Sequence, residues 1–171
     1  MKVTDKYILF WKNWLSNFHY CKITDTFVDF GELTFFCAEQ YFMYIKALTF
    51  NDHQVANKIL YCTKPDEAKE LGRQVRNYDN KIWSKIREKV MYRANFLKYT
   101  QNQELKEKLL NPDWKDKRFV EANPYDKIWA IGLSEDDPRA LNQKTWLGEN
   151  LFGKVLDDVR AQILINENSF N

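Results

Sequence analysis

The hydrophobic and polar positions of residues 37–50, CAEQYFMYIKALTF, predict a buried helix around which the rest of the chain is organised. The segment contains no Pro or Gly, and at 3.6 residues per turn Phe42 and Phe50 fall on one apolar stripe. The opposite side is also apolar or aromatic, which is typical of a helix in a protein interior. Glu39 and Lys46 lie seven residues apart, two turns, and therefore fall on the same stripe.

This acid and this base have two interpretations. They form a buried ion pair, since either charge alone would be costly to bury. Alternatively, the carboxylate of Glu39 and the ammonium of Lys46 face a cleft, where burial tunes their pKa values. The sequence favours the cleft, because active sites concentrate such groups.

The segments before this helix predict a small antiparallel sheet. Residues 7–12 have the composition of a strand, residues 21–31 alternate loosely and end in turn residues, and residues 32–38 form a short strand that runs into the helix.

After residue 50 the pattern becomes helical. Pro65 near a first turn and Asp79 before an apolar repeat are helix-start signals, and Thr100 with Gln103 has the spacing of a capping box. Gly72 inside a helix indicates close packing, or room for a ligand beside Arg73. The expected helices cover residues 51–62, 63–75, 80–99 and 101–110.

The last third of the chain changes character. Residues 119–120 and 128–131 are predicted as strands on either side of a turn at 123–126, NPYD. A helix is expected over residues 145–165, and the last six residues are expected to fray.

Length and composition predict one domain covering residues 1–171, because the chain can bury one substantial core and shows no linker or repeat. The 16% aromatic content, with six Trp, indicates that some rings line a ligand site. A net charge of +2 does not favour a nucleic-acid-binding protein. Three cysteines without CxxC spacing, and two histidines, form no zinc pattern, so no metal is expected. With neither a signal-peptide pattern nor a membrane span, the protein is expected to be cytoplasmic.

Two carboxylates are candidates for chemistry at an acetal-like carbon. Such hydrolysis needs a carboxylate that stabilises an oxocarbenium-like transition state or activates water, and a proton donor for the leaving group. Glu39 and Asp126 are the candidate carboxylates, with Lys46 as donor or as anchor. Glu121 beside the same turn is equally well explained as a solvated acid, and so, less readily, is Asp126.

Other residues are candidates for holding an anion or a planar base. Gly148 and Gly153 flank an expected helix start, whose backbone N–H groups suit an anion, although Asn150 is equally well explained as a simple N-cap. Three tryptophans are candidates for stacking on a base, while most buried tryptophans simply belong to a core: Trp83, Trp129 and Trp146.

Taken together, these stretches resemble the YbiA-like, or NADAR, family over nearly the whole chain. Six motifs occur in the family's order: LSNF at 15–18, AEQYFMYIKA at 38–47, AKELGRQV at 68–75, Trp83 with Arg87 and Met91, VEANPYDKIWAIG at 120–132 and WLGENLFGKVL at 146–156. The chain differs from the usual pattern at three positions: Met43 for Gln, Ala130 for Gly and Phe152 for Leu.

The resemblance implies an α+β, mainly helical domain that hydrolyses an N-glycosidic bond between a base and phosphoribose, without a cofactor. The implied substrates are riboflavin-pathway ribosylaminopyrimidine phosphates. The alternatives are removal of ADP-ribose from guanine, also in nucleic acid, and a non-catalytic ADP-ribose or NAD-binding module. The implied catalytic residues are Glu39, Lys46 and Asp126. The expected substrate-binding residues are Asn17, Arg73, Trp83, Trp129, Gly148 and Asn150.

Overall fold

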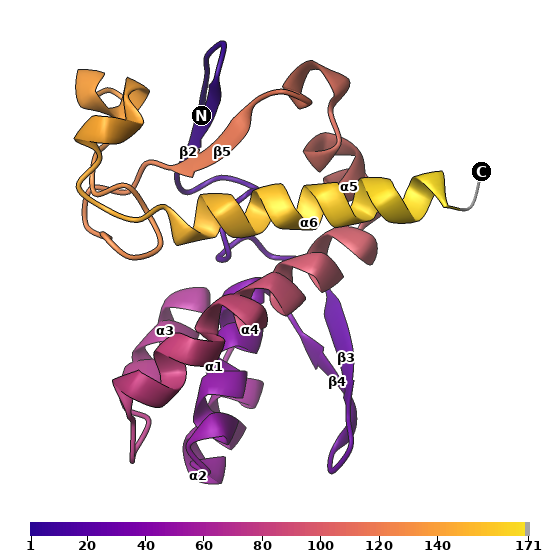
Figure 1. Ribbon diagram of the computed structural model, residues 1–171. Coiled ribbons are helices and arrows are strands. Elements are labelled where there is room, and N and C mark those ends of the chain that lie inside the picture. The colour runs from indigo at the N-terminus through magenta and orange to yellow at the C-terminus, as the bar shows by residue number, and fades with distance from the viewer. Residues whose placement is uncertain (170–171) are drawn as a thin grey trace. The chain divides into compact units, whose positions relative to one another are not determined.

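The computed structural model describes residues 1–169 and divides the chain into two compact units, each considered by itself. Unit 1 comprises Met1–Ser16 and the chain from Glu104 onward, and unit 2 comprises Asn17–Gln103. Helices predominate beside two small sheets, which confirms the α+β, mainly helical class (Figure 1). The prediction that residues 1–171 form one domain stays a prediction.

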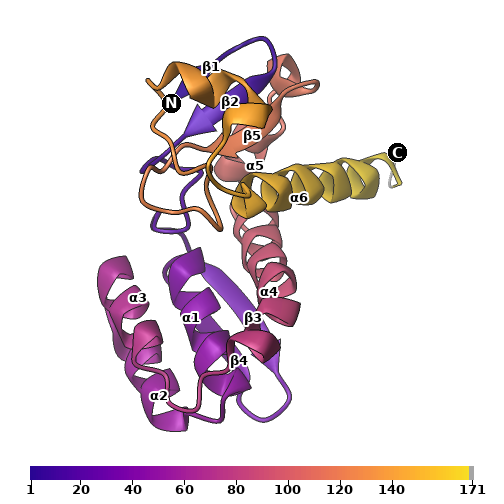
Figure 2. The same ribbon diagram turned by 60° about the vertical axis from the view of Figure 1, so that its left-hand side comes forward.

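Unit 2 is built on α1, which spans Ala38–Thr49. None of its side chains is exposed, so the predicted buried helix is confirmed. Its neighbours α2 and α3 pack beside it (Figure 2), and the long helix α4 packs on it as well. The helices that complete this unit are α2 (His53–Tyr61), α3 (Pro65–Arg73) and α4 (Asn80–Thr100).

Local sequence signals explain where most of these helices begin. Asp79 accepts a hydrogen bond from the backbone of Lys81 and caps α4, and Pro65 occupies the first turn of α3, as predicted. The capping box predicted at Thr100 is wrong, because this residue ends α4 and its hydroxyl bonds to the carbonyl of Phe96.

A two-stranded antiparallel sheet completes unit 2. It pairs β3 (Ile23–Phe27) with β4 (Gly31–Phe35), in the register that places Ile23 opposite Phe35. The prediction of one antiparallel sheet from all the early strands is wrong, because the strand at residues 7–10 pairs within unit 1.

Unit 1 contains a three-stranded sheet with the order β1–β2–β5. The strands are β1 (Lys2–Val3), β2 (Tyr7–Phe10) and β5 (Arg118–Glu121). The β1–β2 pair is antiparallel and the β2–β5 pair is parallel, so β2 finds its partner more than 100 residues later in the chain. A short helix, α5 (Gln103–Leu109), and the long helix α6 (Leu151–Asn168) accompany the sheet, and α6 packs on β5 (Figure 1).

The strand predicted at residues 128–131 is wrong. These residues form an irregular loop, because the carboxylate of Asp126 accepts the backbone N–H groups of Ile128 and Trp129, both at 2.8 Å. Such a side-chain turn competes with strand pairing for the same donors. The predicted fraying is also wrong for residues 166–168, which are helical, and residues 170–171 lie outside the described residues.

Candidate active site

The first turn of α1 buries Glu39 inside unit 2. Glu39 is 6% exposed, and its backbone N–H donates to the carbonyl of Asn17 at 3.0 Å. The N-cap residue, Cys37, accepts the N–H of Gln40 on its sulfur at 3.4 Å. Because the first N–H groups of a helix have no partner within the helix, these two contacts fix where α1 begins.

The side chain of Asn17 is committed to α4. Asn95 donates from Nδ2 to Oδ1 of Asn17 at 3.0 Å, and Asn17 donates from Nδ2 to the sulfur of Met91 at 2.9 Å. Asn17 therefore links α4 to the N–H of Glu39, and its predicted contact with substrate stays a prediction. Asn95 is fully buried and was not predicted as part of the site. The sequence signal for it is a polar residue on the apolar face of α4, beside Met91 and Ala94.

Lys46 lies two turns further along α1, and its ammonium is held by groups from two other segments. Nζ donates to the carbonyl of Gly72 at 2.8 Å and lies 4.5 Å from the ring centroid of Tyr78. Burial lowers the pKa of Lys46, the charge of Glu39 raises it, and the charge of Arg73 lowers it. The acid and the base of α1 therefore interact electrostatically, as the spacing predicted, while the nearest hydrogen-bond acceptor of the ammonium is a backbone carbonyl.

Gly72 allows α3 to approach α1 closely enough for this contact. A Cβ atom at position 72 would lie 2.2 Å from the sulfur of Met43, which confirms the close packing predicted there. Met43, one of the three departures from the usual family pattern, fills the space beside the glycine.

Arg73 and Trp83 also belong to unit 2 but have different surroundings. The side chain of Arg73 is 64% exposed, pairs with Glu70 at 3.1 Å and acts electrostatically on Lys46. Trp83 is 5% exposed and packs against Phe42 with ring centroids 5.1 Å apart. A place in the core explains Trp83, and its predicted contact with a base stays a prediction.

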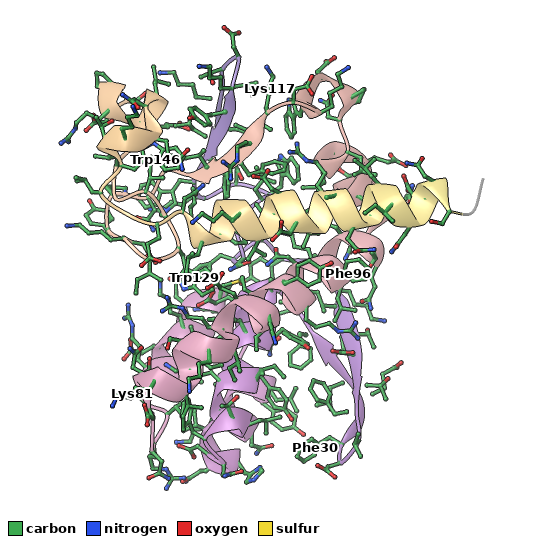
Figure 3. All side chains as sticks on the ribbon, in the orientation of Figure 1. Phe30, Lys81, Phe96, Lys117, Trp129 and Trp146 are labelled. Carbon is green, nitrogen blue, oxygen red and sulfur yellow. The ribbon has the colours of Figure 1, made fainter. Side chains whose placement is uncertain are left out.

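Unit 1 carries the remaining four predicted residues on one loop and at the start of α6. Asp126 shapes the loop through the two hydrogen bonds described above, and Trp129 is half-buried on it. Trp146 lies in a different part of unit 1 (Figure 3), where its Nε1 donates to the carbonyl of Ala140 at 2.9 Å and its ring packs on Tyr7.

The N–H groups expected to be free at the start of α6 have partners, while the predicted contacts of Gly148 and Asn150 with substrate stay predictions. The backbone N–H groups of residues 149 to 152 all donate to carbonyls of the 127–130 loop, at 2.9–3.2 Å. A Cβ at Gly148 would lie 2.3 Å from the carbonyl oxygen of Ala130, so this glycine serves packing. Asn150 is the N-cap residue, with φ of 54°, but its side chain makes no cap hydrogen bond. Instead it accepts from Glu121 N and donates to Phe119 O of β5, both at 3.0 Å.

A cavity of about 470 Å³ lies elsewhere in unit 2. Its lining residues are Tyr20, Cys21, Lys22, Thr34, Phe35, Phe36, Gln40 and Leu60. It includes none of the predicted catalytic residues. In residues 1–169 there is no group of three His, Cys, Asp or Glu side chains that suits a metal ion, and none of the described helices is long and apolar enough to cross a membrane.

The sequence did not predict the ion pair between Asp52 and Arg76. Asp52, the N-cap residue of α2, has a fully buried side chain that accepts three hydrogen bonds from Arg76, from its backbone N–H (2.9 Å), Nε (3.0 Å) and Nη2 (2.6 Å). These bonds hold the α3–α4 connection on the start of α2. The sequence signal for Asp52 is its position as the N-cap of α2. No nearby residue indicates that its partner is Arg76.

We expect this ion pair to make unit 2 sensitive to acid. The hydrogen bonds from Arg76 hold the pKa of Asp52 far below its usual range. The stabilisation is therefore complete above the unfolded-state pKa of about 4 and is lost as the pH falls from there toward the folded-state pKa. Asp52→Asn keeps a capping side chain but removes the charge, so its melting temperature at pH 7 should fall by roughly 3–10 °C.

Thermal unfolding of both proteins between pH 7 and pH 2 checks this expectation. The difference in melting temperature between wild type and Asp52→Asn should shrink below about pH 4, because there the Asp52 carboxylate of the unfolded wild-type chain takes up a proton while that of the folded protein stays charged. A difference that stays constant over the whole range would contradict the role given to this ion pair.

The fold and the acid–base helix of unit 2 define a small α+β protein with groups suited to hydrolytic chemistry. Comparison with known proteins is more specific: the NADAR domain model matches residues 9–164, and the chain belongs to the NADAR family. Protein irg-1 of Caenorhabditis elegans is 42% identical over 133 residues, 77% of this chain and 62% of that protein, so the match spans less than two thirds of the relative's length.

Two further relatives support the family assignment. N-glycosidase R617 of Acanthamoeba polyphaga mimivirus is 42% identical over 125 residues, covering 73% of this chain and 72% of that protein. The NMR structure of the E. coli protein YbiA superposes with a TM-score of 0.73 at 26% identity, covering 97% of this chain and 89% of that chain. The resemblance inferred from the six sequence motifs is therefore confirmed.

Proposed function

We propose that this protein is an N-glycosidase, a hydrolase that cleaves the bond between a base and C1 of a phosphorylated ribose. The observation that carries the proposal is the pairing of Glu39 and Lys46 along α1, in a chain that is 42% identical to a protein named as an N-glycosidase. In the reaction, water adds to C1 as the C–N bond breaks, and the base leaves with the bonding electrons and takes up a proton.

Glu39 suits the reacting carbon. A nearly buried carboxylate beside C1 stabilises the positive charge that develops in an oxocarbenium-like transition state, or accepts a proton from the attacking water. At 1.5 Å rise per residue, Lys46 stands about 10 Å further along the helix. With C1 beside Glu39, a substrate that extends along α1 brings its 5-phosphate toward the Lys46 end, and we therefore assign Lys46 to the phosphate.

Arg73 is a second cation at the Lys46 end of the proposed site, which supports assigning this end to the substrate phosphate. Burial is the main cause of the lowered pKa of Lys46, and the charge of the exposed Arg73 guanidinium adds a smaller lowering by repelling the half-buried ammonium. A phosphate between two such cations relieves the repulsion and accepts charge-assisted hydrogen bonds from both. Asp126 and Trp129 belong to unit 1, and the roles predicted for them stay predictions.

We expect Arg73→Ala to raise the KM of phosphorylated substrates by roughly 10- to 100-fold, because one hydrogen bond to a charged group is lost. The same substrate without its phosphate should be affected less than about threefold. Steady-state kinetics on the matched pair measures the difference. Equal losses on both substrates would remove Arg73 from the phosphate end.

For the substrate itself we propose the riboflavin-pathway ribosylaminopyrimidine phosphates, with ADP-ribosyl guanine as the second candidate. The experiment is mass spectrometry of the purified protein incubated with the ribosylaminopyrimidine phosphate and, separately, with ADP-ribosyl guanosine. Release of the free aminopyrimidine from the first compound alone supports the proposal. Release of unmodified guanosine from the second alone would replace it with the second candidate. Binding without release of a base would identify a non-catalytic module.

A further inference from the structure

Tyr78 lies on the connection between α3 and α4 and makes several side-chain contacts although it is exposed. Its side chain is 45% exposed, yet its ring packs edge-on against Phe50 with centroids 5.3 Å apart, and its hydroxyl donates to Oδ1 of Asn80 at 2.9 Å. The ring also lies 4.5 Å from Nζ of Lys46. An aromatic face at this distance attracts an ammonium ion.

The connection that carries Tyr78 is itself anchored. Arg76, two residues earlier, makes the three hydrogen bonds to the buried carboxylate of Asp52 described above. Asn77 between them has φ of 57°, a left-handed conformation that turns the chain sharply, and that Asn tolerates better than most residues. The ion pair and the turn together determine where the ring of Tyr78 lies.

We propose that Tyr78 is a positioning residue for Lys46: its ring and the Gly72 carbonyl hold the ammonium between them, and the Asp52–Arg76 ion pair holds the ring in place. The inference rests on the proposed function, which places Lys46 at the substrate phosphate. It adds a residue that touches Lys46 rather than substrate.

The contact has a measurable electrostatic consequence. Burial and the charge of Arg73 favour the neutral amine of Lys46, whereas Glu39 on the same helix favours the ammonium. The ring of Tyr78 and the carbonyl of Gly72 also favour the charged form. Removing the ring should therefore lower the pKa of Lys46 further, and the lysine should lose its proton at a lower pH.

Three variants separate this role from simple packing. Tyr78→Leu removes the ring, and Tyr78→Phe keeps it while removing the hydrogen bond to Asn80. Tyr61→Leu is the control, because Tyr61 is a 75% exposed tyrosine on α2 in the same unit. The first readout is the pKa of Lys46 in the substrate-free protein, from NMR of lysine labelled with ¹³C at Cε. The second is the alkaline limb of the pH profile of kcat/KM.

Tyr78→Leu should move both readouts to lower pH by roughly 0.5–1 pH unit. Tyr78→Phe and Tyr61→Leu should leave both where they are in wild type. Arg76→Gln, which keeps the ring and releases its anchor, should move them in the same direction by a smaller amount, and it serves as the second variant if Tyr78→Leu does not fold.

An unchanged Lys46 pKa in Tyr78→Leu, or an equal change in Tyr61→Leu, would overturn the inference. The NMR readout needs no substrate, so it is independent of the proposed function. If Lys46→Met retains full glycosidase activity, the assignment of Lys46 to the phosphate fails, while the NMR titration still decides whether Tyr78 positions the ammonium.

Discussion

Glu39→Gln is expected to keep the fold and to lower turnover by roughly 10²–10⁴-fold, the usual contribution of a general acid or base. The amide has nearly the shape of the carboxylate, but it neither accepts a proton from water nor carries the charge that stabilises an oxocarbenium-like transition state. The backbone contact that starts α1, from Glu39 N–H to the carbonyl of Asn17, does not depend on the side chain.

The measurement is kcat and KM on the ribosylaminopyrimidine phosphate, beside thermal unfolding of both proteins. Gln40→Glu is not a suitable control, because Gln40 itself holds α1 through hydrogen bonds to the carbonyls of Ile59 and Leu60. Glu32→Gln is better, since it removes an exposed carboxylate of unit 2 on β4, apart from the residues assigned to substrate. Activity of Glu39→Gln within a few-fold of wild type would remove Glu39 from the mechanism.

Lys46→Met is expected to lower kcat/KM for phosphorylated substrates by roughly 10- to 150-fold, because the charge-assisted bond to the phosphate is lost. Methionine keeps an unbranched stem in the half-buried site beside Tyr78, so packing losses are limited. The carbonyl of Gly72 loses its donor, and the charge of Glu39 loses the opposing cation on its own helix.

Kinetics and denaturant unfolding together distinguish the two interpretations that the sequence left open. A large loss of kcat/KM with unfolding close to wild type indicates a cation placed for substrate. Removal of a cation that serves a buried ion pair should instead cost roughly 3–5 kcal/mol of stability. A variant destabilised by that amount but fully active when folded would make Lys46 a purely structural residue.

Much of unit 2 is predictable because its signals are local. The helix α1 has no helix breaker, the cap at Asp79 and the proline at position 65 mark two helix starts, and Gly72 marks a close approach. The relation between Glu39 and Lys46 follows from helical periodicity alone.

The failures come from interactions between distant segments. Nothing near β2 indicates that it pairs in parallel with a strand more than 100 residues later. The apolar run at 128–131 has the composition of a strand, but the Asp126 carboxylate takes the N–H groups that a sheet would use. The N–H groups at the start of α6 are satisfied by that same loop, which only the folded chain reveals.

The surroundings of Lys46 show the same limit within the candidate site. Its position on α1 was predictable, whereas its partners Gly72 and Tyr78 come from α3 and from the connection after it. Asp52 and Arg76, which anchor that connection, are 24 residues apart, and their pairing has no periodicity that a sequence pattern would show.

The most direct test of the central claim is the stoichiometry of products from the ribosylaminopyrimidine phosphate, followed by mass spectrometry with wild type and Glu39→Gln side by side. Cleavage of the N-glycosidic bond by wild type should release free aminopyrimidine and ribose 5-phosphate in equal amounts, and Glu39→Gln should release both roughly 10²–10⁴-fold more slowly. Contradiction would come from loss of the phosphate with the base still attached to ribose, or from equal release of base by wild type and Glu39→Gln.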